Sequence, residues 1–330
     1  MRGLAGMLTG AVLAASALLV PGPAQAIGPY PDLGSCQVFP DPPASLSPRA
    51  PSLPTQAAWN QDVSKAPVAR NSAATIAYIA SQGGDFLHPD FGSPRAYGFP
   101  YAVVGVGRPR LPVNYTAYGD ESDPGPFPVP GGAPVEGGRS SDGDRHVLVV
   151  DRSRCILYEL YRAFFEPRPR PHWNADSGAE WDLRSTALRP DSWTSADAAG
   201  LPIFPGLARY DEAASGSVEH AIRVTFESTR DAWVHPASHC AGDTANPAAP
   251  AMGTRLRLRA GYPLSGFSGP ALAIAQALKS YGMIVADNGS NWFFSGSSDQ
   301  RWDDENLSRL KRIPGRAFEV VRSAARAHAC

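Results

Sequence analysis

Two β-rich runs near the middle of the chain constrain its fold most. They are residues 145–150, RHVLVV, and residues 155–161, CILYELY, with a short polar segment between them. Two such runs joined by a turn of about four residues are typical of a β-hairpin. The sequence therefore predicts a pair of antiparallel strands over residues 145–161.

Alternation of polar and apolar residues predicts further strands at residues 218–226 and 254–260. In the second run, the leucines would lie on one face of the strand and the arginines on the other. Such alternation is typical of an antiparallel sheet with one buried face and one face in water. Shorter strands are expected at residues 283–286 and 292–295.

Short helices are expected at residues 71–81, 270–281 and 303–312. The first begins after an asparagine cap, the second has a proline in its first turn, and Asp303 or Asp304 would cap the third. Together these elements predict a mainly β fold, an antiparallel β-sandwich or jelly roll with a few short helices.

The beginning of the chain is typical of a secretory signal peptide, residues 1–26. Arg2 supplies a positive charge, residues 4–20 are apolar and uncharged, and residues 24–26, Ala-Gln-Ala, fit a cleavage site. The apolar run is shorter than the roughly 20 residues that a spanning helix needs. We expect cleavage after Ala26 and a secreted, extracellular protein with no stable membrane anchor.

The rest of the chain divides into a short segment and a domain. Residues 27–57 hold many prolines and few large apolar side chains, which is typical of an extended segment. Residues 58–330 are expected to form a single β-rich domain, long enough to bury a core. Residues 120–143 show no periodicity and predict a long irregular loop, a type of segment that often carries function.

All four cysteines follow the predicted cleavage site. An even number of cysteines in an exported protein favours two disulfides. We expect one bond between Cys36 and Cys330, near the two ends, and one between Cys155 and Cys240, which lie beside strand-like runs. The two other pairings remain open. No spacing matches a zinc finger or a redox CxxC motif.

Charge and motifs exclude several functional classes. The chain has 30 basic and 31 acidic residues and no run of like charge, so neither nucleic acid nor an anionic membrane is an expected partner. A G-x-S-x-G nucleophile motif and a P-loop are both missing. We therefore expect no α/β-hydrolase, no bound nucleotide and no cofactor.

Several stretches resemble a known group of proteins. They include GDRHVLVVDRSRCILYELY, STALRPDSWTSADAAGLPIFPGLARYDE, VEHAIRVTFESTRDAWVHPASH and ALKSYGMIVADNGSNWFFSGSSDQRWDDENL. Together, over residues 59–322, they resemble a family of secreted bacterial proteins of about this size that has no assigned function. The resemblance implies a single unit, and it implies no activity and no catalytic residues.

A pair of carboxylates is the first candidate for chemistry. Glu159 lies in the middle of a predicted strand. Asp182 follows Glu180 by two residues, a spacing that would place Glu180 and Asp182 on the same face of a strand. Two carboxylates beside aromatic side chains are what glycoside cleavage requires. His220 would assist proton transfer near neutral pH. The alternative is that the acids lie on a solvated strand face and the histidine is hydrogen-bonded within the sheet.

The expected substrate-binding residues are aromatic, basic and polar. Trp181 and Trp292 would offer flat apolar faces to sugar rings, and Arg223 would neutralise a substrate carboxylate. Asp287 and Asn288 lie beside Trp292, in a segment whose Asn-Gly pair is typical of a hairpin turn. They would line the rim of the site.

Metal ligands receive weaker support. His235 and His239 have the spacing of zinc ligands on a helix, but Pro236 between them argues against a helix, and HExxH is absent. The acidic residues 120–123 could bind calcium but lack the EF-hand pattern. We therefore predict no metal ligands.

Three functions fit these features. The favoured one is a secreted carbohydrate-active enzyme, a polysaccharide hydrolase or lyase, with Glu159 and Asp182 as the acid/base pair, His220 assisting, and extracellular polysaccharide as partner. The second is a non-catalytic extracellular protein that binds cell-wall polymer or another protein through its Pro/Gly loops. The third is a secreted metal-dependent hydrolase. The length of the chain favours the enzyme, because few binding modules are this long.

Overall fold

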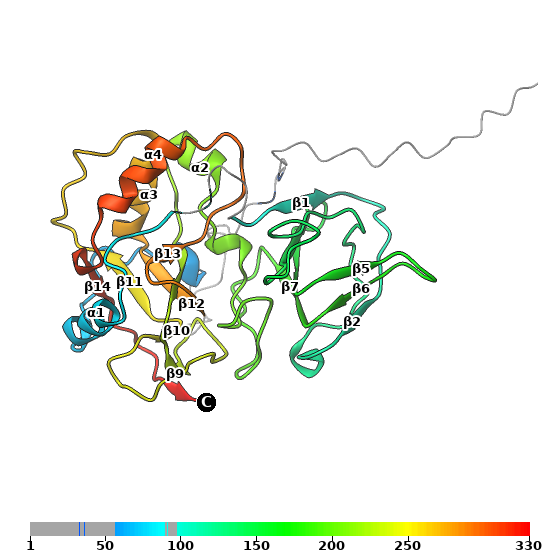
Figure 1. Ribbon diagram of the computed structural model, residues 1–330, viewed down its shortest axis with the longest axis horizontal. Helices are drawn as coiled ribbons and strands as arrows, with labels where there is room; N and C mark the ends of the chain where they lie inside the picture. The colour runs from blue at the N-terminus through cyan, green and yellow to red at the C-terminus, as the bar shows by residue number, and fades with distance from the viewer. Residues whose placement is uncertain (1–32, 34–35, 37–56, 90, 92–97) are drawn as a thin grey trace, which may run out of the picture.

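A computed structural model describes residues 33, 36, 57–89, 91 and 98–330. The predicted signal peptide and almost all of the Pro-rich segment lie outside the described residues. Strands and a few short helices make up the fold, as the sequence predicts. The strands β1 to β7 gather in one half of the molecule, and the α-helices of the described residues lie in the other half (Figure 1).

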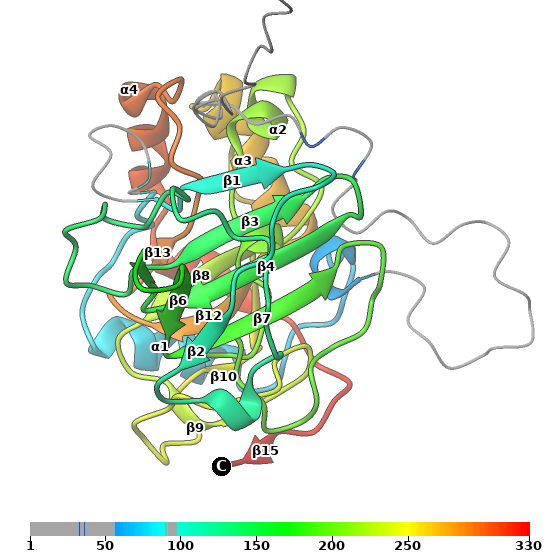
Figure 2. The ribbon, with the colours of Figure 1, turned by 90° about the vertical axis from the view of Figure 1, so that its right-hand side faces the viewer.

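The first half is built around a four-stranded sheet in the order β1-β3-β4-β7. Its members are β1 (Tyr101–Val104), β3 (Val147–Asp151), β4 (Ile156–Tyr161) and β7 (Ser177–Asp182). The predicted hairpin is confirmed, because β3 and β4 pair antiparallel with Val150 opposite Leu157. β1 lies at one edge of the sheet and β7 at the other (Figure 2).

A three-stranded sheet covers one face of the four-stranded sheet. Its order is β2-β6-β5, and its members are β2 (Val113–Tyr115), β5 (Phe164–Glu166) and β6 (His172–Ala175). Phe127, Tyr158 and Trp173 are buried between these layers in one apolar cluster. The Phe127 and Tyr158 rings lie 5.0 Å apart, so residues of the long loop form part of this core.

The second half is built around a five-stranded sheet in the order β13-β8-β12-β11-β14. The strands of this sheet are β8 (Ile222–Phe226), β11 (Arg255–Leu258), β12 (Met283–Asn288), β13 (Phe293–Phe294) and β14 (Phe318–Val320). The α-helices of this half are α1 (Ser72–Ser81), α2 (Tyr210–Ser215), α3 (Gly269–Ser280) and α4 (Asp304–Ser308). A small sheet in the order β10-β9-β15 lies beside it, formed by β9 (Arg230–Trp233), β10 (Ala251–Met252) and β15 (His328–Ala329). Short 3-10 helices lie at Ala58–Asn60, Gly119–Glu121, Phe204–Gly206, Arg309–Arg312 and Gly315–Ala317.

The predicted helices are confirmed. α1 and α3 occupy the predicted ranges, and α4 begins after Asp303, whose side chain accepts hydrogen bonds from the backbone N–H groups of Glu305 and Asn306. This side chain supplies acceptors for N–H groups that a helix leaves free in its first turn. The Asp303 cap is therefore confirmed, whereas the side chain of Asn71, the expected cap of α1, makes no capping hydrogen bond.

The prediction that one face of β11 is exposed to solvent is wrong. Arg255 and Arg257 are buried, as are the leucines between them. The guanidinium of Arg255 donates to the backbone carbonyl of Gln61 at 3.0 Å, and Arg257 donates to the carbonyl of Val63 and to Glu319. The segment that precedes α1 therefore covers this face, and its carbonyl groups satisfy the buried charges.

The sheets are mixed rather than purely antiparallel. Each of the four sheets in the described part contains one parallel pair: β1 with β3, β2 with β6, β8 with β12, and β9 with β10. An antiparallel sandwich or jelly roll is therefore not confirmed. The predicted Asn-Gly hairpin is also wrong, because β12 and β13 lie on opposite sides of β8 and do not pair with each other.

The expected disulfide pairing is wrong. The bonds join Cys36 to Cys155 and Cys240 to Cys330. Leu33 packs against the four-stranded sheet, which brings Cys36 to the start of β4. The last strand, β15, pairs with β9 and so brings Cys330 to the segment that follows β9. Each bond therefore follows a long-range contact that spacing does not reveal.

A third apolar cluster joins the two halves. It contains Leu148, Leu157 and Trp181 from the four-stranded sheet, together with Ile203 and Phe204. The last two belong to the connecting segment, residues 183–221, which joins β7 to β8. The connecting segment thus packs on the sheet face opposite the one that β2, β5 and β6 cover.

Candidate functional site

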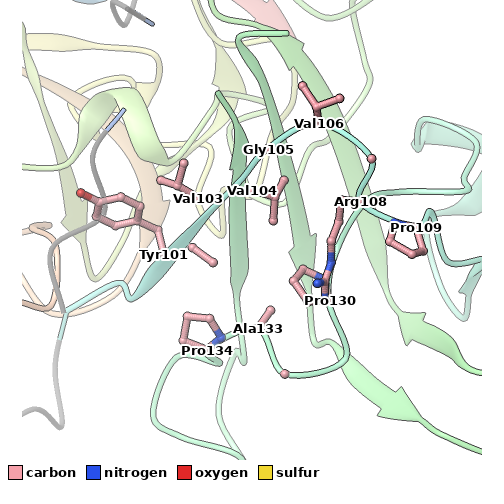
Figure 3. A pocket seen from close by; sticks show the side chains of 13 residues that line it. Tyr101, Val103, Val104, Gly105, Val106, Arg108, Pro109, Pro130, Ala133 and Pro134 are labelled. Atoms are coloured by element: carbon pink, nitrogen blue, oxygen red, sulfur yellow. The ribbon is translucent and has the colours of Figure 1, made fainter. Parts of the chain in front are cut away.

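A groove of about 670 Å³ runs along β1 (Figure 3). The whole of β1 forms one wall, and the turn at residues 105–109 closes one end. Pro130, Gly132, Ala133 and Pro134, from the long Pro/Gly loop, form the opposite wall. The groove therefore combines a sheet edge with the irregular loop that the sequence marks as functional.

β1 is the edge strand of its sheet, and its residues line this groove. β3 is the only strand that pairs with β1 in the described part of the chain. The carbonyl of Val104 accepts a hydrogen bond from the Arg152 N–H at 3.0 Å, so Val104 directs its groups toward β3. Alternate residues in a parallel ladder point to the same side. Tyr101 and Val103 therefore direct their N–H and C=O groups toward the open edge.

The lining of the groove is mostly apolar, and Arg108 is the one charged side chain among the described residues that line it. Val106 is 91% exposed, at the turn that closes the groove. Prolines and aliphatic side chains favour apolar ligands, and a guanidinium favours a carboxylate. The groove therefore suits an extended chain with apolar side chains and an acidic group near Arg108.

Glu159, a predicted catalytic residue, is fully buried at the junction of the two halves. Its carboxylate accepts hydrogen bonds from the N–H groups of Ile203 and Phe204, at 3.0 and 2.9 Å, and from the indole of Trp181 at 3.2 Å. Burial raises the pKa of Glu159 to about 7, although the two backbone hydrogen bonds act in the other direction. Its visible role is to hold the connecting segment against β4.

The other two predicted catalytic residues lie elsewhere. Asp182 is at the exposed end of β7, opposite Ile156 rather than Glu159. A hydrogen bond from Arg184 lowers the pKa of Asp182. His220 is buried in the second half, where its ring contacts the carbonyl of Ala221 at 2.7 Å and Glu212 at 3.0 Å. The structure does not bring the predicted catalytic residues together.

Arg223 and Asp287, predicted to bind substrate, do contact each other. The Arg223 guanidinium is buried and donates to Asp197 and to Asp287, each at 2.7 Å, and to Ser295 at 3.0 Å. The charges of this group are therefore satisfied within the protein. The group links β8, β12 and the connecting segment.

The remaining predicted substrate-binding residues are internal. Trp292 is 1% exposed and packs edge-on against Phe226 in the main core. Trp181 is buried, and Asn288 uses its amide to bind Thr229 and the carbonyl of Ala241. None of these side chains faces the groove.

A buried ion pair that the sequence did not predict lies at the same junction. His146 Nδ1 is 2.5 Å from Glu136, and His146 Nε2 contacts the carbonyl of Ala196 at 3.0 Å. Burial alone would lower the pKa of His146, but the charge and hydrogen bond of Glu136 raise it to about 9. The imidazolium thus ties the end of the long loop to β3 and the connecting segment.

Stability is expected to fall as the pH rises through about 9. Because the folded-state pKa of His146 lies above its ordinary value of 6.5, its contribution is complete below 6.5 and is lost above 9. The loss should approach about 3 kcal/mol. Urea unfolding between these pH values measures it. The Glu136→Gln variant should show a flatter profile, and an equally steep one would contradict this origin.

Comparison of this chain with known proteins and structures gives no match. No family model, no curated protein and no solved structure matches this chain. The resemblance to secreted bacterial proteins therefore stays a prediction. Any functional statement must come from the groove and its surroundings.

Two structural findings bear on where the protein works. The disulfides are consistent with an extracellular protein, since such bonds persist in oxidising compartments. No helix among the described residues is both long enough and apolar enough to span a bilayer.

Proposed function

We propose that this chain is an extracellular binding protein that holds an extended polypeptide segment of a partner along β1. The observation that carries the proposal is the open edge of β1 inside a groove. An added strand would pair with the outward N–H and C=O groups of Tyr101 and Val103. The disulfides and the predicted signal peptide support the extracellular location.

A polypeptide fits this edge better than a polysaccharide does. Only a polypeptide repeats donors and acceptors at the spacing of a β-ladder. The described residues that line the groove include no tryptophan to stack on a sugar ring, and Tyr101 is the aromatic residue among them. Arg108 adds a preference for a segment with an acidic residue or a terminal carboxylate.

The carbohydrate-active enzyme stays a hypothesis with less support. Its proposed carboxylates, Glu159 and Asp182, lie on neighbouring strands of one sheet but not opposite each other, and each already has partners. The binding protein, which the sequence offered as the second function, uses the Pro/Gly loop that forms a wall of the groove. We therefore favour binding.

The Val103→Pro variant tests the proposal. Proline has no N–H, so it removes one outward donor while leaving the bonds from Ala102 and Val104 to β3 in place. Peptides selected from a phage-displayed library of random dodecapeptides should bind the wild type. Their affinity, measured by fluorescence anisotropy, should fall at least roughly tenfold in Val103→Pro.

Val103→Ala is the matched control, because it shortens the same side chain and keeps the N–H. It should retain most of the affinity. Arg108→Gln should weaken acidic peptides selectively and reduce the salt dependence of binding. The proposal fails if no peptide is selected, or if selected peptides bind wild type and Val103→Pro equally. Circular dichroism should first show that both variants fold.

A further inference from the structure

Two histidines and one aspartate converge beside β9, away from the groove. The ligand atoms of Asp191, His235 and His328 all lie within 4.8 Å of one another. They come from three separate parts of the chain: the loop after β7, the segment after β9, and β15. In the sequence, the zinc-ligand spacing pairs His235 with His239. In the structure, however, His239 Nδ1 contacts the carbonyl of Ala198 at 2.9 Å.

The fold holds His328 in place by three contacts. β15 pairs antiparallel with β9, with His328 opposite Trp233. The His328 ring stacks on the Trp233 indole, with centroids 4.0 Å apart and planes 4° from parallel. Two residues later, Cys330 is bonded to Cys240. The imidazole therefore has a defined position although it lies on the last strand of the chain.

His235 is held beside the same tryptophan. Its ring meets Trp233 edge-on at 5.1 Å, and the His235 and His328 rings are 5.6 Å apart. Trp233 thus positions both imidazoles. The Nδ1 atom of His235 is buried and has no hydrogen-bond partner among the described residues. The other ring nitrogen, Nε2, faces Asp191, so the ring can offer Nε2 to an ion while Nδ1 stays inside the protein.

The distance between His235 and Asp191 fits a shared ligand. His235 Nε2 lies 3.5 Å from Asp191 Oδ1, which is too long for a good hydrogen bond. Two ligands at about 2.1 Å from one tetrahedral zinc ion are roughly 3.4 Å apart. The two side chains are 37% and 54% exposed, so an ion can reach them from solvent.

We propose that Asp191, His235 and His328 bind a divalent transition-metal ion, Zn²⁺ in the first instance. Two imidazole nitrogens and one carboxylate oxygen are ligands that zinc prefers, and they leave the fourth position to water. Calcium and magnesium prefer oxygen ligands and would bind weakly. A bound ion would cross-link the last strand to β9 and to the loop after β7. This site is independent of the proposed peptide groove.

Isothermal titration of the chelator-treated, disulfide-bonded protein with ZnCl₂ tests the site. We expect one ion per chain at neutral pH, and no comparable heat with CaCl₂ or MgCl₂. His328→Ala and Asp191→Asn should each weaken binding by more than about tenfold. Binding should also weaken at acid pH, because imidazole binds metal only in its neutral form. Hydrogen exchange at residues 325–330 should slow when Zn²⁺ is added.

His172→Ala is the matched control. His172 lies in β6, where its Nδ1 contacts the carbonyl of Arg170, and it has no part in the cluster. This variant should bind Zn²⁺ as the wild type does. Absence of stoichiometric binding would overturn the proposal. So would binding that survives both His328→Ala and Asp191→Asn, or that His172→Ala abolishes equally.

Discussion

Replacement of Arg223 by methionine is expected to lower the free energy of unfolding by about 3–5 kcal/mol. The guanidinium is buried and is the partner of Asp197, whose side chain is 0% exposed, and of Asp287. Methionine fills similar space but leaves these carboxylates inside the protein without a cation. An uncompensated buried charge costs far more than the net value of the pair it came from.

A matched exposed pair separates this effect from a general loss of arginine. Arg184 also makes a two-pronged contact with an aspartate, Asp182, but both side chains are solvated. Arg184→Met should leave the free energy of unfolding almost unchanged, because solvent screens this exposed pair. The double variant Arg223→Met/Asp197→Leu should recover part of the loss. Urea unfolding at pH 7 measures all of these, and equal costs for the two arginines would refute the argument.

Replacement of Glu159 by leucine is also expected to lower the free energy of unfolding strongly. It leaves the N–H groups of Ile203, Phe204 and the Trp181 indole buried without an acceptor. Each of the three donors costs about 1–3 kcal/mol, so we expect a total loss of at least about 3 kcal/mol. Because these donors hold the connecting segment against β4, hydrogen exchange should accelerate most near residues 203–204.

Glu159→Gln is the control, because its amide oxygen still accepts a hydrogen bond, and it should cost less than Glu159→Leu. It also tests the pH dependence. Burial raises the folded-state pKa of Glu159 from 4.5 to about 7. Its contribution to stability is therefore complete below pH 4.5 and is lost as the pH rises through 7, by about 3 kcal/mol. The glutamine variant should lack this fall. A wild-type profile that is equally flat would show that the carboxylate is not desolvated as described.

Local patterns predicted the local part of the fold. The hairpin at β3 and β4, helices α1 and α3, and the Asp303 cap each depend on neighbouring residues, and each is confirmed. The parallel pair of β8 and β12 is formed by segments far apart in the chain, so alternation could not reveal it. Arg255 and Arg257 alternate with leucines as a wet face would, but a distant segment covers them.

Long-range contacts also determine which predicted site residues come together, and local patterns do not reveal such contacts. Glu159 follows the strand alternation, and only the position of the connecting segment shows that its carboxylate is used internally. The side-chain chemistry of Arg223 and Asp287 predicts a role in binding, and the structure does bring them together, as an internal ion pair. The groove could be predicted in part, because the aperiodic Pro/Gly loop that forms one wall is visible in the sequence. The partnership of His235 with His328 depends on the pairing of β9 with β15.

The early segment that packs in the second half has a consequence for the order of folding. Trp59, Ile76 and Leu87 belong to the core that residues 199–320 complete, and the Trp59 carbonyl accepts from the Ala221 N–H at 2.7 Å. During synthesis this segment appears first, yet its partners appear last, after β1 to β7 have been made. The strand pairs among β1 to β7 can therefore form while the earlier segment still lacks the residues that complete its core. When synthesis is slow, a protease should therefore cleave within residues 57–89 more readily than within the sheets that follow them.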